Sequence, residues 1–295
     1  MSKRKTILLT LLTMLLWGSL FPMVKLGFKA LGTVTVADIL TFAGIRFFIC
    51  GAIICVYSAV FNKTSYKSVG GSVAMILASG FFAIILHYSF NYLGLNMTDS
   101  SKAALIKQIG SLLYVCFSFV FIKEDKPTLI KIVSAVIGFI GIAVLNLSSE
   151  GFYVSMGDVL ILCASFCYVI SNIISKKVFA KAEPTVSTGI SHFFGGGVLL
   201  AVGLIMGGKI HFTSLSAVLI FAYICAASVV SYCLWFSIVK NGELSKLLIL
   251  KFAEPVFACI FGAVILGENI FKVQYLAAFI IISGAILLSN LSKKA

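Results

Sequence analysis

The chain has 295 residues, of which 60% are hydrophobic and 11% are charged. Soluble domains carry about 25% charged residues, so the composition excludes a soluble protein, which would lack the polar side chains to coat its surface. The mean hydropathy of +1.11, together with repeated apolar runs of roughly 20 residues, predicts an all-α membrane protein in a lipid bilayer.

Ten apolar segments are predicted to cross the bilayer. They lie near residues 6–26, 35–57, 72–93, 102–122, 129–147, 157–175, 187–207, 215–237, 246–266 and 272–291. The first has the basic start and apolar run of a signal peptide but no small-residue cleavage site, so we expect an uncleaved span. The eight cysteines all fall within predicted spans without metal-ligand spacing, so we interpret them as packing residues and expect no metal site.

The net charge of +13 would suggest a nucleic-acid partner in a soluble protein. Here membrane topology explains the charge, and we expect no nucleic acid to bind. With the N-terminus in the cytoplasm, 15 of the 23 Lys and Arg residues fall in cytoplasmic loops, 5 fall in outer loops and 3 remain within spans. This distribution follows the positive-inside rule and predicts a multi-pass plasma-membrane protein with both termini cytoplasmic.

The chain contains an internal repeat. Two segments align at a constant offset of 144 residues, which pairs Lys107 with Lys251 and also Tyr88 with Tyr232. Each half holds five predicted spans, and because five is odd, two homologous halves must have opposite orientations in the membrane. This is the inverted-repeat arrangement of many secondary transporters, whose substrate site lies near the midplane between the repeats.

Small residues predict close helix contacts in the seventh span. We interpret Gly203 and Gly207 as a GxxxG packing motif and expect Gly195–Gly197 to admit a neighbouring backbone. The alternative is that these glycines only reflect the high frequency of glycine in membrane helices.

Polar and aromatic side chains share one face in each of five predicted spans, at the helical spacing that lines a path. Span three, for example, places His87 and Asn91 one turn apart beside Tyr88. The residues in these faces that we expect to bind a substrate are Trp17, His87, Tyr88, Asn91, Lys107, Tyr114, Tyr168, Asn172, Tyr232 and Trp235. The aromatic members are suited to enclose a ring or a cation, with packing and interfacial anchoring as the alternatives.

The segments WGSLFPMVK (Trp17–Lys25) and AEPVFACIFGAVILGE (Ala253–Glu268), in two halves of five spans, resemble the EamA family of the drug/metabolite transporter superfamily. The resemblance covers essentially the whole chain. It implies a ten-helix inverted-repeat transporter with a first EamA-like repeat at residues 1–148 and a second at residues 153–291. It also implies a central cavity lined by spans one, three, four, six, eight and nine, and export or import of amino acids or small metabolites.

Lys107 and Lys251 are cations inside predicted spans, where a charge usually serves a pathway. One interpretation is that both bind an anionic group of the substrate, a carboxylate or a phosphate. Plastid phosphate translocators of the same superfamily similarly use basic residues in these spans. The alternative is that each lysine, about five residues into its helix, extends to the nearby surface and has a structural role.

Glu254 and Arg46 are the candidates for coupling or gating. Glu254 is the acid deepest in a span, and it either couples transport to protons or forms a static pair with Lys251, three residues earlier, which we favour. Arg46 has no acid within easy reach on its own helix, so we expect it to line a gate. His87 and His192 are candidates for a proton relay, although hydrogen-bonded structural roles are favoured.

The first span contains no acid. Small multidrug members of the superfamily carry a key carboxylate eight residues before a lysine, where this chain has Trp17 before Lys25. The two lysines within spans also repel cations, so proton exchange for lipophilic cations is disfavoured.

These features predict a secondary active transporter, exporter or importer, that moves a small polar metabolite by alternating access. An amino acid or related organic anion is the favoured substrate, and amino acid export is one expected activity. The alternatives are a transporter of cationic or neutral drugs or metabolites, a solute or ion channel, and an integral membrane enzyme. The sequence has no GxxxxGK[ST] loop, HExxH motif or paired catalytic carboxylates, so we expect no enzyme, no catalytic residues and no cofactor. The expected partners are the small-molecule substrate and the lipid bilayer, and the expected state is a monomer.

Overall fold

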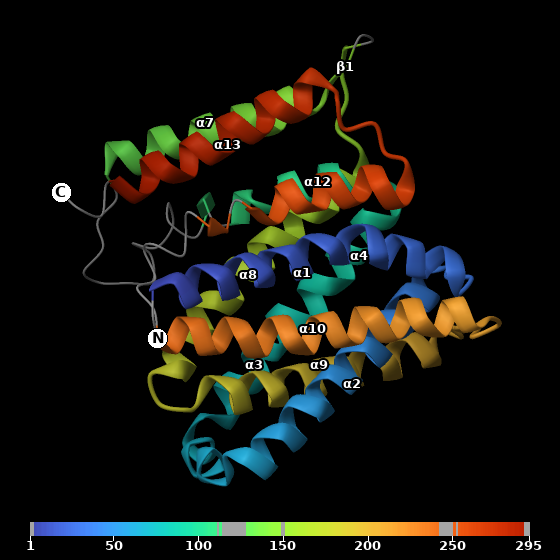
Figure 1. Cartoon of the computed structure of the whole chain (residues 1–295), viewed down its shortest axis with the longest axis vertical. Coiled ribbons are helices and arrows are strands. Elements are labelled where there is room, and N and C mark those ends of the chain that lie inside the picture. Colours follow the sequence, from blue (N-terminus) through green and yellow to red (C-terminus); the bar gives the residue numbers. More distant parts are fainter. Residues whose placement is uncertain are drawn as a thin grey trace.

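The computed structural model describes residues 3–110, 112–113, 128–148, 151–241, 250–251 and 253–291, and within these residues the chain is almost entirely helical (Figure 1). The helices are α1 (Lys3–Ala30), α2 (Val36–Phe61), α3 (Val73–Gly80), α4 (His87–Met97), α5 (Ser100–Lys107), α7 (Leu129–Leu145), α8 (Met156–Phe179), α9 (Pro184–Ile205), α10 (Leu215–Asn241), α12 (Ala253–Leu266) and α13 (Val273–Leu291). Shorter turns are η1 (Lys63–Ser68), η2 (Gly70–Ser72) and η3 (Phe81–Leu86), the last a π-helical turn that joins α3 to α4. Two antiparallel strands, β1 (Leu147–Ser148) and β2 (Gly151–Phe152), lie at the predicted boundary between the two repeats.

Six segments are long and apolar enough to cross a membrane. They are Arg4–Ala30, Val36–Phe61, Gly70–Met97, Met156–Phe179, Pro184–Ile205 and Leu215–Trp235, and the shorter apolar helices are Ile132–Leu145, Ala253–Leu266 and Val273–Leu288. The fourth predicted span is described only in part, and its Tyr114 lies outside the described residues. The predicted all-helical, multi-pass architecture is confirmed.

Two helix pairs form opposite edges of the bundle. Figure 1 shows α7 beside α13 along one edge and α2 beside α9 along the other, with the remaining helices between them. Inside, Phe28, Phe42, Tyr92 and Phe221 make edge-to-face contacts with ring centroids 5.0–6.0 Å apart. This aromatic cluster joins α1, α2, α4 and α10 at the centre of the molecule.

Capping boxes set the starts of α2 and α8. Thr35 accepts a hydrogen bond from the backbone of Asp38, whose carboxylate accepts from the backbone of Thr35 in return. Ser155 and Asp158 repeat the arrangement at α8. Each box satisfies amide donors that the first helical turn leaves without partners.

Glycines let α2 and α9 pack backbone to backbone. A Cβ on Gly51 would collide with the backbone of Phe193, and a Cβ on Gly196 would collide with the backbone of Phe48. The close approach predicted for Gly195–Gly197 is therefore found at Gly196.

The GxxxG interpretation of the same helix is only half right. A Cβ on Gly203 would lie 2.6 Å from the backbone nitrogen of Thr41, so this glycine does pack against α2. Gly207 lies beyond the end of α9, and a Cβ there would meet no atom within 4 Å. Its φ of +83° shows that it ends the helix in the left-handed region instead.

Gly196→Ala is expected to lower the free energy of unfolding by about 1–3 kcal/mol, because the added methyl group forces α2 and α9 apart. The matched control is Gly284→Ala on α13, where a Cβ would meet no atom within 4 Å. Replacing glycine by alanine in an open helical position should stabilise the protein by about 0.5–1 kcal/mol. Thermal unfolding of the purified variants checks this, and equal shifts in Tm would contradict the packing argument.

Candidate functional site

The bundle contains a partly open cavity of about 190 Å³. Its walls come from α1, α2, α3, η3, α4, α5, α8, α9, α10 and α12, together with Gln108 and Lys251. The predicted site residues that line it are Trp17, Arg46, His87, Tyr88, Asn91, Lys107, Tyr168, Asn172, Tyr232, Trp235, Lys251 and Glu254. Every predicted site residue that the structure describes therefore lines the same cavity.

The close contact between α1 and α12 positions the carboxylate of Glu254 in this cavity. A Cβ on Gly18 would lie 2.7 Å from both the carbonyl oxygen of Glu254 and the Cβ of Phe257, so only a glycine permits this approach. Glu254 is 4% exposed as a residue and reaches the cavity from the first turn of α12.

Glu254 pairs with Lys107 and not with Lys251, so the predicted static pair is wrong. The Lys107 Nζ lies 2.8 Å from Glu254 Oε1. Lys251 precedes the start of α12 and therefore does not share a helical face with Glu254, as the spacing rule assumed. Its ammonium group lies 5.3 Å from the centroid of the Trp235 ring instead.

An aromatic row runs from Arg46 to Lys251. The Arg46 guanidinium carbon lies 5.7 Å from the centroid of Tyr88, whose hydroxyl oxygen is 3.1 Å from that of Tyr232. Two further contacts, Trp17 to Tyr232 at 6.0 Å and Trp17 to Trp235 at 5.3 Å between centroids, complete the row. The row gives the cavity a wall of aromatic rings between two cations.

Two histidines are held by backbone carbonyls. His87 Nδ1 lies 2.8 Å from the Ala164 carbonyl oxygen, and His192 Nδ1 lies 2.8 Å from that of Thr188. A carbonyl only accepts, so each Nδ1 carries the proton and donates it, and Nε2 of the neutral ring is an acceptor. These bonds fit the structural role favoured for both rings.

The sequence reasoning missed the contribution of α9. Ser187, Thr188, Ser191 and His192 of this helix line the cavity. Their i, i+3 and i+4 spacing was a readable signal, but the resemblance implied a cavity without spans two and seven. Both spans contribute, because α2 also supplies Arg46.

A layer of polar contacts lies directly beyond the cavity. The lining includes Val24 and Leu95, and the layer begins with Lys25 and Thr98. The Lys25 Nζ donates to the Thr98 carbonyl oxygen over 2.6 Å and lies 4.0 Å from the Glu268 carboxylate. We call this the polar layer; its members are Lys25, Thr98, Asp99, Ser100, Ser101, Lys102, Asn146, Asp158, Glu268 and Tyr275.

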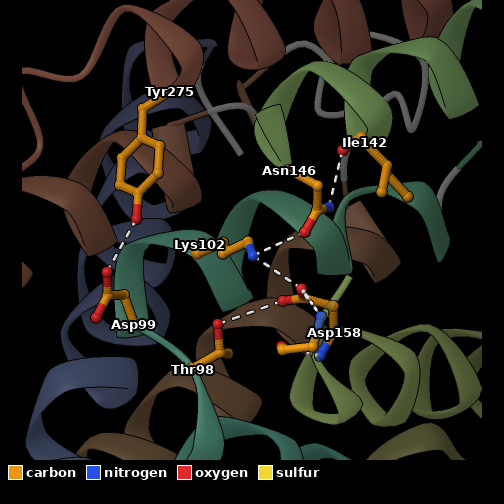
Figure 2. Close-up of polar contacts among 8 residues, drawn as sticks. Thr98, Asp99, Lys102, Ile142, Asn146, Asp158 and Tyr275 are labelled. Atoms are coloured by element: carbon orange, nitrogen blue, oxygen red, sulfur yellow. Dashed lines mark hydrogen bonds and ion pairs between the residues drawn. The ribbon is translucent and has the colours of Figure 1, made fainter. Parts of the chain in front are cut away.

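The centre of the polar layer is the ion pair between Lys102 and Asp158 (Figure 2). The Lys102 Nζ lies 2.8 Å from Asp158 Oδ2 and donates a second bond of 2.8 Å to the Asn146 side chain. Thr98 donates to the other oxygen of Asp158, and Tyr275 donates to Asp99. The layer thus connects the loop between α4 and α5 to the starts of α8 and α13 and to the end of α7.

Glu268 closes the polar layer on the α12 side. Its carboxylate accepts hydrogen bonds from the backbones of Ser100 and Ser101, at 2.7 and 3.0 Å, and from the Ser101 hydroxyl at 2.6 Å. Burial opposes ionisation, but these hydrogen bonds outweigh it and hold the pKa of Glu268 below its ordinary value of 4.5. Glu268 is therefore a carboxylate at neutral pH, at the start of α5 where the helix dipole favours an anion.

Acid is expected to weaken this contact. Because the folded pKa of Glu268 is the lower one, its stabilisation is fully present above the ordinary value of 4.5 and is lost as pH falls through the folded pKa. The difference in Tm between the native protein and Glu268→Gln should therefore be constant near neutral pH and shrink in acid. Both proteins share the other residues of the polar layer, so the difference reports on Glu268. A difference that does not change between pH 7 and pH 3.5 would contradict the assignment.

Comparisons with known proteins agree with this architecture. A profile of the EamA-like transporter family matches residues 4–147 and again residues 155–290. An uncharacterized transporter of Archaeoglobus fulgidus is 24% identical over 277 residues, which cover 90% of each chain. The uncharacterized transporter YvbV of Bacillus subtilis is 24% identical over 302 residues, covering 99% of this chain and 94% of its own.

Two further proteins are less similar to this chain in sequence. The uncharacterized inner membrane transporter YedA of Escherichia coli is 21% identical over 285 residues, covering 93% of this chain and 87% of its own. A solved crystal structure with 18% identity has a TM-score of 0.68 over 99% of both chains. At that identity the structural similarity supports the fold alone.

Proposed function

The chain belongs to the EamA-like transporter family and is a multi-pass membrane transporter, and from that premise we propose that it is a secondary active transporter of a small metabolite bearing an anionic group. The substrate class is an amino acid or a related organic acid. The predicted site residues that line the cavity are its binding residues.

The main support for this proposal is the net positive charge of the cavity. Among the described residues, Arg46, Lys107 and Lys251 line it with one carboxylate, that of Glu254, which leaves a net charge of +2 with both histidines neutral. A cationic substrate would meet this excess of positive charge unfavourably, and an anion would relieve it. The Lys107–Glu254 pair can open to exchange one carboxylate for another.

The proposal includes ten membrane crossings in two inverted repeats, residues 1–148 and 153–291. The helix contacts support it, since exchanging the halves maps α7 onto α13 and α2 onto α9, and each of these is a contacting pair. The same exchange maps the contact of α1 with α10 onto that of α8 with α4, and α1 with α12 onto α8 with α5. Such an exchange pattern is expected when two homologous units surround one site.

The proposal also assigns one end of the cavity to the outer side of the membrane and the other end to the cytoplasmic side. The positive-inside distribution puts both termini in the cytoplasm and the polar layer on the outer side. The cavity lining extends away from that layer to Phe179 at the end of α8 and Ser187 at the start of α9. We assign the polar layer as the outer gate, closed in this conformation, and alternating access requires it to open.

Counterflow into proteoliposomes tests the transporter assignment. Vesicles loaded with unlabelled glutamate, succinate or another acid should accumulate the labelled compound transiently and with saturation. Uptake that rises linearly with concentration would indicate a channel, and activity only with quaternary amines would overturn the anionic substrate class.

The matched variants are Lys251→Gln in the cavity and Lys29→Gln on the exposed end of α1. Lys102 is unsuitable as a control because it is paired with Asp158. Only Lys251→Gln should raise the substrate concentration needed for half-maximal counterflow.

A further inference from the structure

Arg46 is a buried cation whose charge has no counter-charge within the described residues. The residue is 2% exposed, and its guanidinium stays protonated under all ordinary conditions. Its Nε and Nη2 groups donate to the Ser228 hydroxyl over 3.2 and 2.7 Å. Ser228 is neutral, and the guanidinium also lies over the rings of Phe47 at 4.7 Å, Tyr92 at 5.6 Å and Tyr88 at 5.7 Å.

The described acids are all engaged elsewhere. Asp38 and Glu183 cap α2 and α9, Asp99 accepts from Tyr275, Asp158 pairs with Lys102, Glu254 pairs with Lys107, and Glu268 accepts from Ser100 and Ser101. The other four of the ten acids, Glu124, Asp125, Glu150 and Glu243, lie in predicted loops outside the described residues. Since buried charges are normally paired, the position facing Arg46 in the cavity suits an anion from outside the chain.

Buried polar atoms near Arg46 also lack partners in the described part of the protein. They are the Asn91 Oδ1, the Tyr92 hydroxyl and the His192 Nε2, and all three residues line the cavity at 5% exposure or less. The His192 ring packs 5.6 Å from Phe47 and 4.5 Å from Tyr232 between centroids, which holds it beside the aromatic row. Leaving such buried groups without partners is unfavourable, so the site suits a polar occupant.

The opposite end of the aromatic row holds the second cation. Lys251 lies over Trp235, while Lys107 already has Glu254. Among the described residues that line the cavity, Arg46 and Lys251 are thus the two cations without a carboxylate partner, and Tyr88, Tyr232, Trp17 and Trp235 lie between them.

We propose that Arg46 binds one carboxylate of the substrate, Lys251 binds a second, and the aromatic row contacts the apolar segment between them. The ligand class is an elongated dicarboxylate, which neutralises the net charge of +2. This inference rests on the proposed function and names the substrate class of the same cavity. It replaces the gating role expected for Arg46 by a direct contact, because a planar guanidinium matches a carboxylate in a bidentate geometry.

Tryptophan fluorescence measures binding directly, because the only two tryptophans of the chain, Trp17 and Trp235, both line the cavity. The full-length protein in detergent is titrated with succinate, glutarate and adipate, and with the monomethyl ester of each. The best dicarboxylate should bind about 10- to 150-fold more tightly than its monoester, equivalent to ~1.5–3 kcal/mol for a charge-assisted contact.

The variants are Arg46→Gln, Arg46→Lys and Lys251→Gln, with Lys29→Gln as the exposed control. Arg46→Gln and Lys251→Gln should each abolish the preference for the dicarboxylate, and Arg46→Lys should retain part of it. Arg46→Gln should not lower the Tm of the unliganded protein, since it removes a charge without a counter-charge, so lost binding is separable from misfolding.

Equal dissociation constants for dicarboxylate and monoester, or an unchanged preference in Arg46→Gln, would overturn the inference. If monocarboxylates bind as well as dicarboxylates, a site that binds two carboxylates is ruled out, and the proposal of an anion transporter is unaffected. If no carboxylate binds, Arg46 is not a carboxylate-binding residue. The counterflow assay then tests independently whether the protein transports organic anions.

Discussion

Glu254→Gln is expected to destabilise the unliganded protein by about 1–3 kcal/mol, and adding Lys107→Gln should recover most of that loss. The Glu254 side chain is 5% exposed and the Lys107 side chain 24%. Removing one partner of a fully buried pair costs about 3–5 kcal/mol, and access of Lys107 to the cavity lowers this figure. The double variant keeps the two side chains polar and removes both charges.

A double-mutant cycle on the free energy of unfolding measures the coupling. Glu183→Gln serves as the control, because it makes the same chemical change at the cap of α9, away from the cavity. Additive losses in the double variant would show that the 2.8 Å contact contributes no net stability.

The same substitution has an opposite expected effect on ligand binding. Glu254→Gln removes the carboxylate that neutralises Lys107, so it raises the net charge of the cavity by one. Anions should bind more tightly and counterflow should slow, because a more tightly held substrate is released more slowly. Faster counterflow with weaker binding would contradict this expectation.

Hydropathy and helical spacing were enough to predict the all-helical, multi-pass architecture and twelve of the residues that line the cavity. A span is recognised from an apolar run long enough to cross the bilayer, and a polar stripe is recognised from the 3.6-residue period of a helix. Both features can be read within a single segment of the sequence. Trp17, His87, Asn91 and Tyr232 could be placed on inward faces for this reason, before any contact between helices was known.

The partner of Glu254 could not be found by the same reasoning. Lys107 lies 147 residues away in sequence, and the contact exists because Gly18 lets α12 pack against α1. The spacing rule chose Lys251 because it assumes an uninterrupted helix, and α12 begins after that residue. Tertiary packing, which no local pattern encodes, decides the pair.

The polar layer was missed for a different reason. Lys102 and Asp158 lie at helix starts, where charged residues are ordinary surface groups, and the topology count treated Lys102 as an outer-loop charge. Their burial, with Asp158 fully inaccessible, depends on α5, α7 and α8 meeting at one end of the bundle.

Asp158→Asn is expected to open the outer gate. The substitution leaves one carboxamide oxygen, which can still accept from the backbone of Ser155 and cap α8. It replaces the oxygen that accepts from Thr98 by an NH2 group, and it removes the charge that neutralises Lys102. Loss of about 1–3 kcal/mol from the closed state would raise the population open to the outside by roughly 5- to 150-fold.

Labelling of a single cysteine measures this opening. In a variant without the eight native cysteines, Leu20→Cys places a thiol on the cavity wall, 9% exposed in the closed conformation. A membrane-impermeant maleimide added to intact cells should react faster when Asp158→Asn is present. Lys102→Gln added to that background should restore slow labelling, because it removes the unpaired cation.

Asp38→Asn is the control that separates gating from helix capping. Asp38 occupies the same capping-box position at the start of α2, on the same end of the bundle, but its partners are Thr35 and the backbones of Val34 and Lys209 rather than a cationic side chain. If loosening any cap at this end admits the reagent, both substitutions will accelerate labelling equally. If the Lys102–Asp158 charge pair holds the cavity closed, only Asp158→Asn will do so, because only that variant leaves a buried ammonium without its carboxylate.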